Sequence, residues 1–206
     1  MKIKVYVVGE QKNYANFLND FEMVNDISDA QVVIFTGGED VDPKLYGAKK
    51  HPSTFCNPAR DEYEVDMFKK IKPNQLVVGI CRGSQFLCVM NGGKLVQDIP
   101  GHALYGTHPI TDGSMTYEIT STHHQMQYPF NLDRDDYDIL FYSHRAAYYD
   151  GDGIDPDAIS CDVEICLYHK KGLPKCLAIQ GHPEYMRKNS PVVEKINNII
   201  YKLLDE

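Results

Sequence analysis

The segment from Leu76 to Met90 restricts the fold of this chain more than any other. Residues Leu76–Ile80 form an almost continuous apolar run, which is typical of a strand buried on both faces of a parallel sheet. The run ends in the segment GICRG, residues 79–83, and Ser84–Met90 then has the pattern of a helix that stops at an Asn-Gly-Gly sequence. A buried strand, a glycine-flanked turn and a helix in succession are typical of an α/β protein with a parallel sheet.

The rest of the chain supports this fold class. Helices are expected at Asn57–Lys70 and at Pro191–Leu204, where apolar residues recur at helical spacing. The expected strands are Ile3–Val8, Gln31–Phe35, Met115–Ile119, Tyr137–Tyr142, Cys161–Tyr168 and Cys176–Ile179. Early alternation of strands and helices followed by shorter strands predicts an α/β domain with a smaller β-rich insertion. No linker divides the chain, so we expect residues 1–206 to form a single domain.

Composition excludes several classes of function. The formal net charge is −8, from 21 basic and 29 acidic residues, and no run of Lys and Arg is present, which disfavours a nucleic-acid partner. No signal peptide and no apolar segment near the ~20 residues of a membrane span are found, so we expect a cytoplasmic protein without membrane association. The six cysteines include no C-x-x-C pair, and paired Cys/His spacings are absent. We therefore expect no disulfide framework, and the sequence predicts no metal site.

Cys81 lies at the centre of the glycine-flanked turn. A nucleophile on a tight turn between strand and helix is exposed at the carboxyl end of the sheet, where open α/β folds bind ligands. The positive end of the following helix favours a thiolate, and its first amides can bind an oxyanion. The alternative is that Cys81 is a small buried residue, the interpretation we prefer for Cys88 and Cys176.

The tripeptide His182-Pro183-Glu184 could supply a base and a residue that orients it. Pro183 favours an extended conformation at His182, and residues two apart in an extended segment face the same way. The tripeptide follows the expected strand Cys176–Ile179, as the cysteine turn follows its own strand. Both would then meet at one edge of the sheet, although a surface His beside an unrelated Glu remains the alternative.

A glycine loop follows a third expected strand. The segment TGGEDVDPKLYG spans residues 36–47, and its Gly37-Gly38 pair allows close approach of the backbone to a ligand. The amide of Gly38 or of Glu39 could complete an oxyanion hole with the amide of Arg82. An ordinary glycine turn would explain the same residues.

Together these segments resemble the class I glutamine amidotransferases, and most closely the γ-glutamyl-γ-aminobutyrate hydrolase group of the peptidase C26 type. The resemblance rests on motifs that keep the family order over residues 37 to 184: GGEDVDPKLYG, RDEYE (Arg60–Glu64), GICRGSQFLCVMNGGKLVQDI, HHQ (His123–Gln125) and HPE. It implies a flavodoxin-like three-layer α/β/α fold with a mostly parallel central sheet.

The resemblance also implies a function. Cys81 would attack a γ-glutamyl amide and form a γ-glutamyl thioester, with His182 as base and acid and Glu184 orienting it. The Gly38 and Arg82 amides would bind the oxyanion, and the substrate would be a small γ-glutamyl amine or glutamine. The residues implied to line the glutamyl pocket are Gln85, His123, His124 and Gln125. No cofactor is implied.

Three other functions are compatible with these residues. The first is a glutaminase subunit that delivers ammonia to a separate synthetase, and a partner would be needed because no P-loop motif is present. The others are a non-catalytic binding protein and a protein of the intracellular-protease and deglycase type. The oligomeric state, including a homo-oligomer, stays open, as does the role of residues 126–157.

Several polar residues receive a structural interpretation. Asp61, Glu62 and Glu64 are interpreted as an acidic cluster at a helix N-terminus, favourable to the helix dipole. His102 and His108 are placed in Gly/Pro-rich loops, with a structural role or on the surface.

Overall fold

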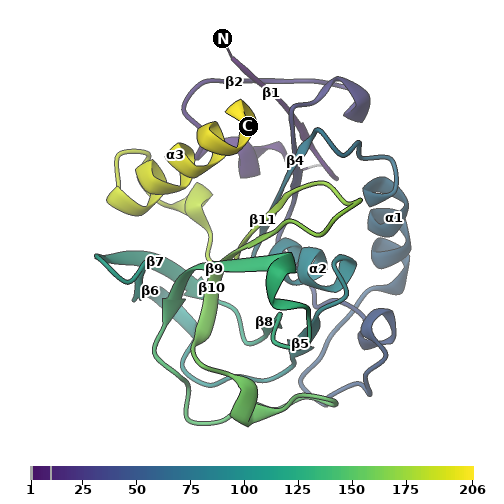
Figure 1. Ribbon diagram of the computed structural model, residues 1–206, viewed down its shortest axis with the longest axis vertical. Helices are drawn as coiled ribbons and strands as arrows, with labels where there is room; N and C mark the ends of the chain where they lie inside the picture. The colour runs from purple at the N-terminus through teal and green to yellow at the C-terminus, as the bar shows by residue number, and fades with distance from the viewer. Residues whose placement is uncertain (1, 10) are drawn as a thin grey trace.

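The computed structural model describes residues 2–9 and 11–206, and a large central sheet organises them (Figure 1). Its strand order is β2 (Phe21–Met23), β1 (Ile3–Val7), β3 (Val32–Phe35), β4 (Leu76–Ile80), β11 (Cys176–Ile179), β10 (Asp162–Tyr168), β9 (Tyr137–Ser143), β6 (Ala103–Thr111) and β7 (Thr116–Thr122). A separate pair is formed by β5 (Lys94–Val96) and β8 (Met126–Tyr128). Short 3₁₀ helices lie at Lys12–Ala15, Ile27–Asp29, Pro43–Tyr46, Arg134–Asp136, Pro156–Ala158 and Pro183–Tyr185.

The sheet has a parallel and an antiparallel half. Strands β2, β1, β3, β4 and β11 pair in parallel, whereas β10, β9, β6 and β7 pair antiparallel with their neighbours. Only β10 and β6 run opposite to the other strands of this sheet, so its strands mostly point one way. The antiparallel half is the β-rich part that the later segments of the sequence predicted.

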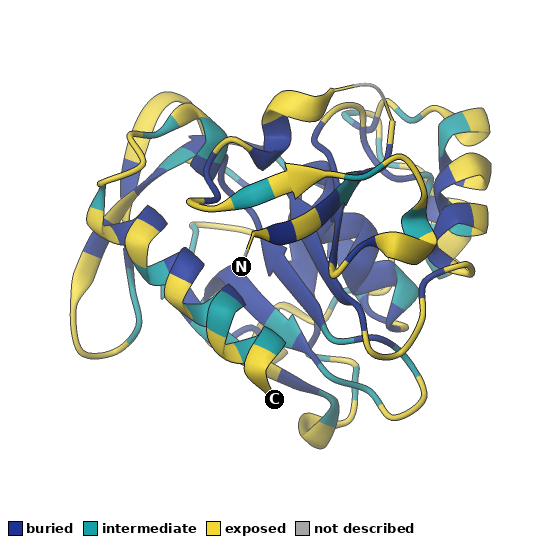
Figure 2. Ribbon diagram, turned by 90° about the horizontal axis from the view of Figure 1, so that it is seen from above, coloured by how far each residue is buried: buried dark blue, intermediate teal, exposed yellow. Residues whose placement is uncertain are grey.

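Helices cover both faces of the sheet. Helices α1 (Pro58–Phe68) and α2 (Arg82–Met90) pack on one face, and α3 (Pro191–Asp205) packs on the other. Side chains of β4 alternate between the two cores, because Val78 and Ile80 belong to the α3 side and Val77 to the α1–α2 side. In Figure 2 the central strands are buried while the helices expose their outer faces. This arrangement confirms the three-layer α/β/α prediction.

The predicted elements match best where the sequence is buried on both faces. The bounds of β4 and β11 coincide with the prediction, and α2 begins two residues earlier than expected. Strands β2, β5, β6 and β8 were not predicted. The loop placement of His108 was wrong, since it is a buried residue of β6. Most of β6 is exposed, so its sequence lacks the apolar pattern of a strand. None of the helices formed by the described residues has the length and apolar character of a membrane span.

Candidate active site

Cys81 occupies a strained turn between β4 and α2. Its φ of 53° is the only positive φ of a non-glycine residue in the described ranges. A Cβ on Gly79 would lie 2.4 Å from the Gly83 carbonyl oxygen, and one on Gly83 would lie 2.2 Å from that of Phe35. Both glycines are therefore required by the turn, and the backbone has the geometry of a nucleophile elbow. Strain of this kind is typical of functional sites.

His182 reaches the same edge of the sheet from the neighbouring strand. Strand β11 pairs in parallel with β4, with Ile179 opposite Ile80, so the residues after both strands emerge together. His182 is 6% exposed, and its Nδ1 lies 2.7 Å from Oε1 of Glu184. A carboxylate oxygen only accepts, so Nδ1 carries the proton in this contact and Nε2 is left to act as a base.

The protonation of His182 depends on its two partners. Burial lowers the pKa of His182, but hydrogen bonds and charge interactions with Cys81 and Glu184 outweigh burial and raise that pKa to about 10. These partners therefore stabilise the imidazolium.

The glycine loop after β3 completes the site. A Cβ on Gly37 would lie 3.0 Å from Cε1 of His182 and 3.5 Å from Cβ of Cys81, so this loop runs against both catalytic candidates. Within residues 2–9 and 11–206, the amides of Gly38 and Arg82 donate no hydrogen bond to another group of the chain. Neither amide is therefore occupied within these residues, and their role as an oxyanion hole stays a prediction.

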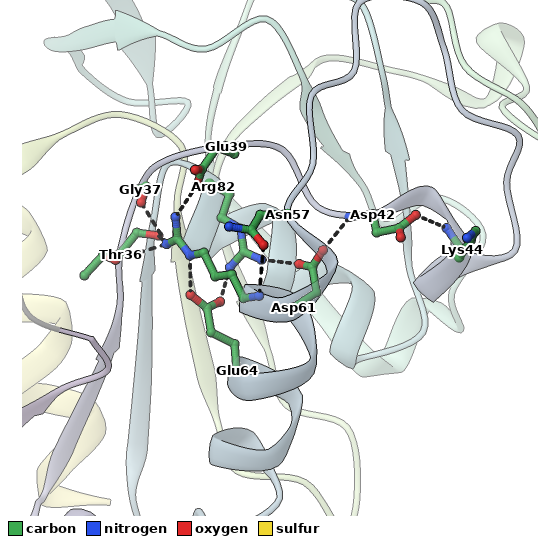
Figure 3. A network of polar contacts seen from close by, with 10 residues as sticks. Thr36, Gly37, Glu39, Asp42, Lys44, Asn57, Asp61, Glu64 and Arg82 are labelled. Atoms are coloured by element: carbon green, nitrogen blue, oxygen red, sulfur yellow. Dashed lines mark hydrogen bonds and ion pairs between the residues drawn. The ribbon is translucent and has the colours of Figure 1, made fainter.

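A buried ion-pair network holds this loop and the elbow in place (Figure 3). The Arg82 side chain is 2% exposed and donates to both Asp61 and Glu64 of α1. Arg60 donates to Glu64 at 2.8 Å and to the Gly37 carbonyl at 2.9 Å. Asp61 lies in the first turn of α1, as the interpretation of an acidic cluster at a helix N-terminus predicted, but Asp61 and Glu64 have a further role. Their carboxylates neutralise a buried arginine that the sequence could not place beside them.

The four residues expected to bind substrate differ in exposure. His124 is half-buried, and its Nε2 lies 3.1 Å from Oδ1 of Asp40, whose carboxylate raises the pKa of His124. Gln85 is 3% exposed and donates to the Gln125 carbonyl, and Gln125 is fully buried. His123 is also buried, and its ring contacts His102 and Glu164. His124 is thus the member of this set whose side chain is not buried.

A second buried polar group, missed in the sequence, lies in the antiparallel half of the molecule. We call His102, His108, His123 and Glu164 the histidine cluster, and all four residues are less than 9% exposed. Burial lowers the pKa of His123 to about 3 and also lowers that of His102, so both rings are neutral at pH 7. No spacing signal could have revealed the cluster, because its members come from separate segments of the chain.

Two tyrosines also contact the catalytic candidates. Tyr185 stacks on the His182 ring with a centroid distance of 4.8 Å, although it is 63% exposed. The Tyr14 hydroxyl lies 2.7 Å from the position of a Cβ on Gly37. Burial, together with the charges of Glu184 and Cys81, raises the pKa of Tyr14 and keeps the phenol neutral. No sequence signal indicates Tyr14. The only signal for Tyr185 is its position directly after the H-P-E tripeptide.

Comparison with known proteins identifies the family. The peptidase C26 family model matches residues 17–184, and the chain belongs to this family within the class I glutamine amidotransferase superfamily. The chain is 32% identical over 168 residues to the Mycobacterium tuberculosis protein named "Putative glutamine amidotransferase Rv2859c", covering 80% of this chain and 54% of that protein. It spans between about half and two thirds of the length of the first three curated relatives.

Solved structures show the same fold. A Thermotoga maritima glutamine amidotransferase matches with a TM-score of 0.52 and 12% identity, covering 99% of this chain and 95% of the other. A Thermoplasma acidophilum protein described as a "putative gmp synthase subunit a" matches with a TM-score of 0.58 and 20% identity, covering 100% and 95%. At these identities the likeness concerns the fold.

Proposed function

We propose that this protein is a cysteine hydrolase that cleaves the γ-glutamyl amide bond of a small γ-glutamyl amine or of glutamine. The observation that carries the proposal is the catalytic geometry. Cys81 lies on a strained elbow at the carboxyl end of β4, and His182 lies next to it. Nδ1 of His182 is held by Oε1 of Glu184 at 2.7 Å. A nucleophile, a base and an orienting carboxylate are the components of covalent acyl transfer. Membership of the peptidase C26 family supports the same chemistry.

The reaction would proceed in two half-reactions. The Cys81 thiolate attacks the γ-carbonyl carbon, and the negative charge passes to the carbonyl oxygen, which the Gly38 and Arg82 amides bind. Collapse of this intermediate breaks the carbon–nitrogen bond, and the His182 imidazolium donates its proton to the departing amine. Neutral His182 then takes a proton from water, whose oxygen attacks the thioester. Glutamate leaves, and the thiolate–imidazolium pair is restored.

Recognition of the glutamyl group would rest on residues beside the elbow. We assign the direct contact to His124, whose ring is accessible and whose charge is supported by Asp40. Gln85, His123 and Gln125 are buried, and they would act by holding the backbone of the HHQ segment. The cytoplasmic location expected from the sequence stays a prediction.

A second candidate is a glutaminase subunit that delivers ammonia to a separate synthetase. The name of the 32%-identical M. tuberculosis relative, a glutamine amidotransferase, favours keeping it. The two functions share the first half-reaction and differ in the fate of the amine, and the second requires a synthetase partner.

The test is to incubate purified protein with glutamine and with a panel of γ-glutamyl amines and to measure glutamate release. The hydrolase proposal predicts release from a γ-glutamyl amine by the protein alone. We expect Cys81→Ala to lose at least about 10³-fold in kcat. Cys161→Ser is the matched control, because Cys161 is half-buried on another segment, and it should keep wild-type activity.

Two outcomes would contradict the hydrolase proposal. Turnover of glutamine alone, increasing when a synthetase is added, would favour the subunit. Full activity in Cys81→Ala would reject the cysteine mechanism for both candidates.

A further inference from the structure

We infer that His102, His123 and Glu164 form a binding site for a divalent transition-metal ion of the Zn²⁺ type. One potential ligand atom from each residue lies within 4.8 Å of the other two. Zinc bound to nitrogen and carboxylate oxygen at about 2.0–2.2 Å needs ligand atoms about 3.4 Å apart in a tetrahedral site. The three side chains would therefore close on the ion by roughly 1 Å, a movement that side-chain rotation can supply.

The strongest observation is that these residues carry buried polar atoms without partners. Nδ1 of His102, Nε2 of His123 and Oε2 of Glu164 each lack a hydrogen bond in the described part of the chain. The three residues are 5%, 3% and 0% exposed, so bulk water does not solvate them. Leaving a buried polar atom unpaired costs about 1–3 kcal/mol, and a cation between Nε2 of His123 and Oε2 of Glu164, which lie 4.0 Å apart, would satisfy both of these atoms.

The other atom of each side chain is already held by a hydrogen bond. Nδ1 of His123 lies 2.9 Å from the Gln125 carbonyl oxygen, which only accepts, so Nδ1 carries the proton and Nε2 offers a lone pair. Nε2 of His102 lies 3.2 Å from Oδ2 of Asp162, which leaves its Nδ1 as the lone-pair nitrogen. Metal-binding histidines commonly donate their second nitrogen to a carbonyl or carboxylate in this way.

Glu164 is oriented in the same manner. Ser143 donates to its Oε1 at 2.8 Å, and Nε2 of His108 lies 3.3 Å from the same oxygen. Its second oxygen, Oε2, faces Nε2 of His123 at 4.0 Å. Two carboxylates, Glu164 and Asp162, would balance the two charges of the ion in this buried position.

An ion bound at this site would connect three segments of the chain. His102 precedes β6, His123 follows β7 and Glu164 lies in β10. The adjoining residues reach the catalytic centre, since Ser121 donates to the His102 carbonyl and the Thr120 hydroxyl contacts the His182 backbone. A bound ion would therefore stabilise the strand that supports His182 without touching the reacting atoms.

The test uses the full chain after dialysis against a chelator. Isothermal titration with ZnCl₂ should show one tight site per chain, and thermal denaturation should show a higher Tm with zinc. Glu164→Gln and His123→Gln should each weaken zinc binding at least 100-fold. Asp162→Asn should weaken binding about 10- to 100-fold, because it orients a ligand. His169→Gln is the matched control, since His169 also pairs with an aspartate, Asp138, but is only half-buried and lies outside the cluster.

Wild-type protein alone supplies an independent readout. Replacement of zinc by Co²⁺ should give visible absorption of tetrahedral nitrogen and oxygen coordination, without the near-ultraviolet band of a cobalt–thiolate bond. The inference is overturned by absence of stoichiometric binding, by affinity unchanged in both ligand variants, or by a thiolate band. Circular dichroism of each variant identifies loss of folding, and the cobalt spectrum of the wild type then decides the question.

Discussion

Two buried polar groups flank the candidate active site, and they differ in how many of their polar atoms have a hydrogen-bond partner. In the ion-pair network of Arg60, Asp61, Glu64 and Arg82, both oxygens of each carboxylate have a donor. In the histidine cluster, several nitrogens and one carboxylate oxygen have none in the described residues. A buried charge is tolerated when it is paired, and both carboxylates of the network are fully paired as the chain folds, although Nε of Arg82 has no partner among the described residues. The cluster would need a further partner to reach the same state.

The difference also separates the ways in which the two groups support catalysis. The network reaches the glycine loop directly, since Arg60 donates to the Gly37 carbonyl, and it anchors the residue after Cys81. The histidine cluster reaches His182 indirectly, through Thr120 and Ser121 of β7. The nucleophile and its loop thus rest on carboxylates whose oxygens all have donors, whereas the base is supported by a cluster in which Oε2 of Glu164 has none in the described residues.

The largest expected change in the free energy of unfolding follows from a substitution in the ion-pair network. Glu64→Ala leaves Arg82 buried with one carboxylate fewer, and we expect the free energy of unfolding to fall by about 3–5 kcal/mol. Urea denaturation measures this change, and the loss should be the same with and without zinc. Glu62→Ala, exposed on the same helix, is the control and should change stability by less than about 0.5 kcal/mol. A small loss in Glu64→Ala would mean that the network is not a major source of stability.

The second-largest expected effect is the stabilisation that zinc provides when it binds to the histidine cluster. Zinc at 100 times its Kd should stabilise the wild type by about 2.7 kcal/mol. Glu164→Gln should lose this gain, because the amide replaces the anionic ligand. Comparison of urea denaturation with zinc and with chelator measures the gain in each protein. An equal zinc effect in both would remove the distinction between the two buried groups.

A third prediction concerns His182, which lies between the two groups. Its pKa is raised from 6.5 to about 10 by Cys81 and Glu184 despite burial, so the folded protein holds this proton more tightly than the unfolded chain. The resulting stability is complete below pH ~6.5 and is lost as pH rises toward 10. The stability difference between wild type and His182→Gln should therefore shrink by more than about 1.4 kcal/mol over this range. A difference independent of pH would contradict the imidazolium assignment.

The smallest effect should come from the link between the histidine cluster and the base. The Thr120 hydroxyl accepts from the His182 amide at 2.7 Å and contacts its carbonyl at 3.1 Å. Thr120→Val keeps the shape but removes both contacts, and we expect a loss of about 1 kcal/mol in stability with a several-fold lower kcat. Thr120→Ser should restore both. Thr116→Val, on an exposed position of the same strand, is the control.

The sequence predicted the features that adjacent residues encode, and it missed an exposed strand. Strands β4 and β11 were predicted to the residue because burial on both faces leaves a continuous apolar run. The elbow, the H-P-E tripeptide and the glycine loop were visible for a similar reason, since a tight turn or an extended tripeptide is encoded by adjacent residues. Strand β6 was missed because it is exposed along most of its length.

The sequence by itself determined the local geometry of the turn around Cys81, because the backbone there leaves no space for a Cβ at positions 79 and 83, which are glycines. Tertiary structure alone decided which distant side chains meet. Asp61 and Glu64 pair with Arg82 because α1 packs beside the start of α2, and His102, His123 and Glu164 converge because β10, β6 and β7 fold against one another. Contacts of this kind depend on strand order and helix packing, which no short stretch of sequence encodes.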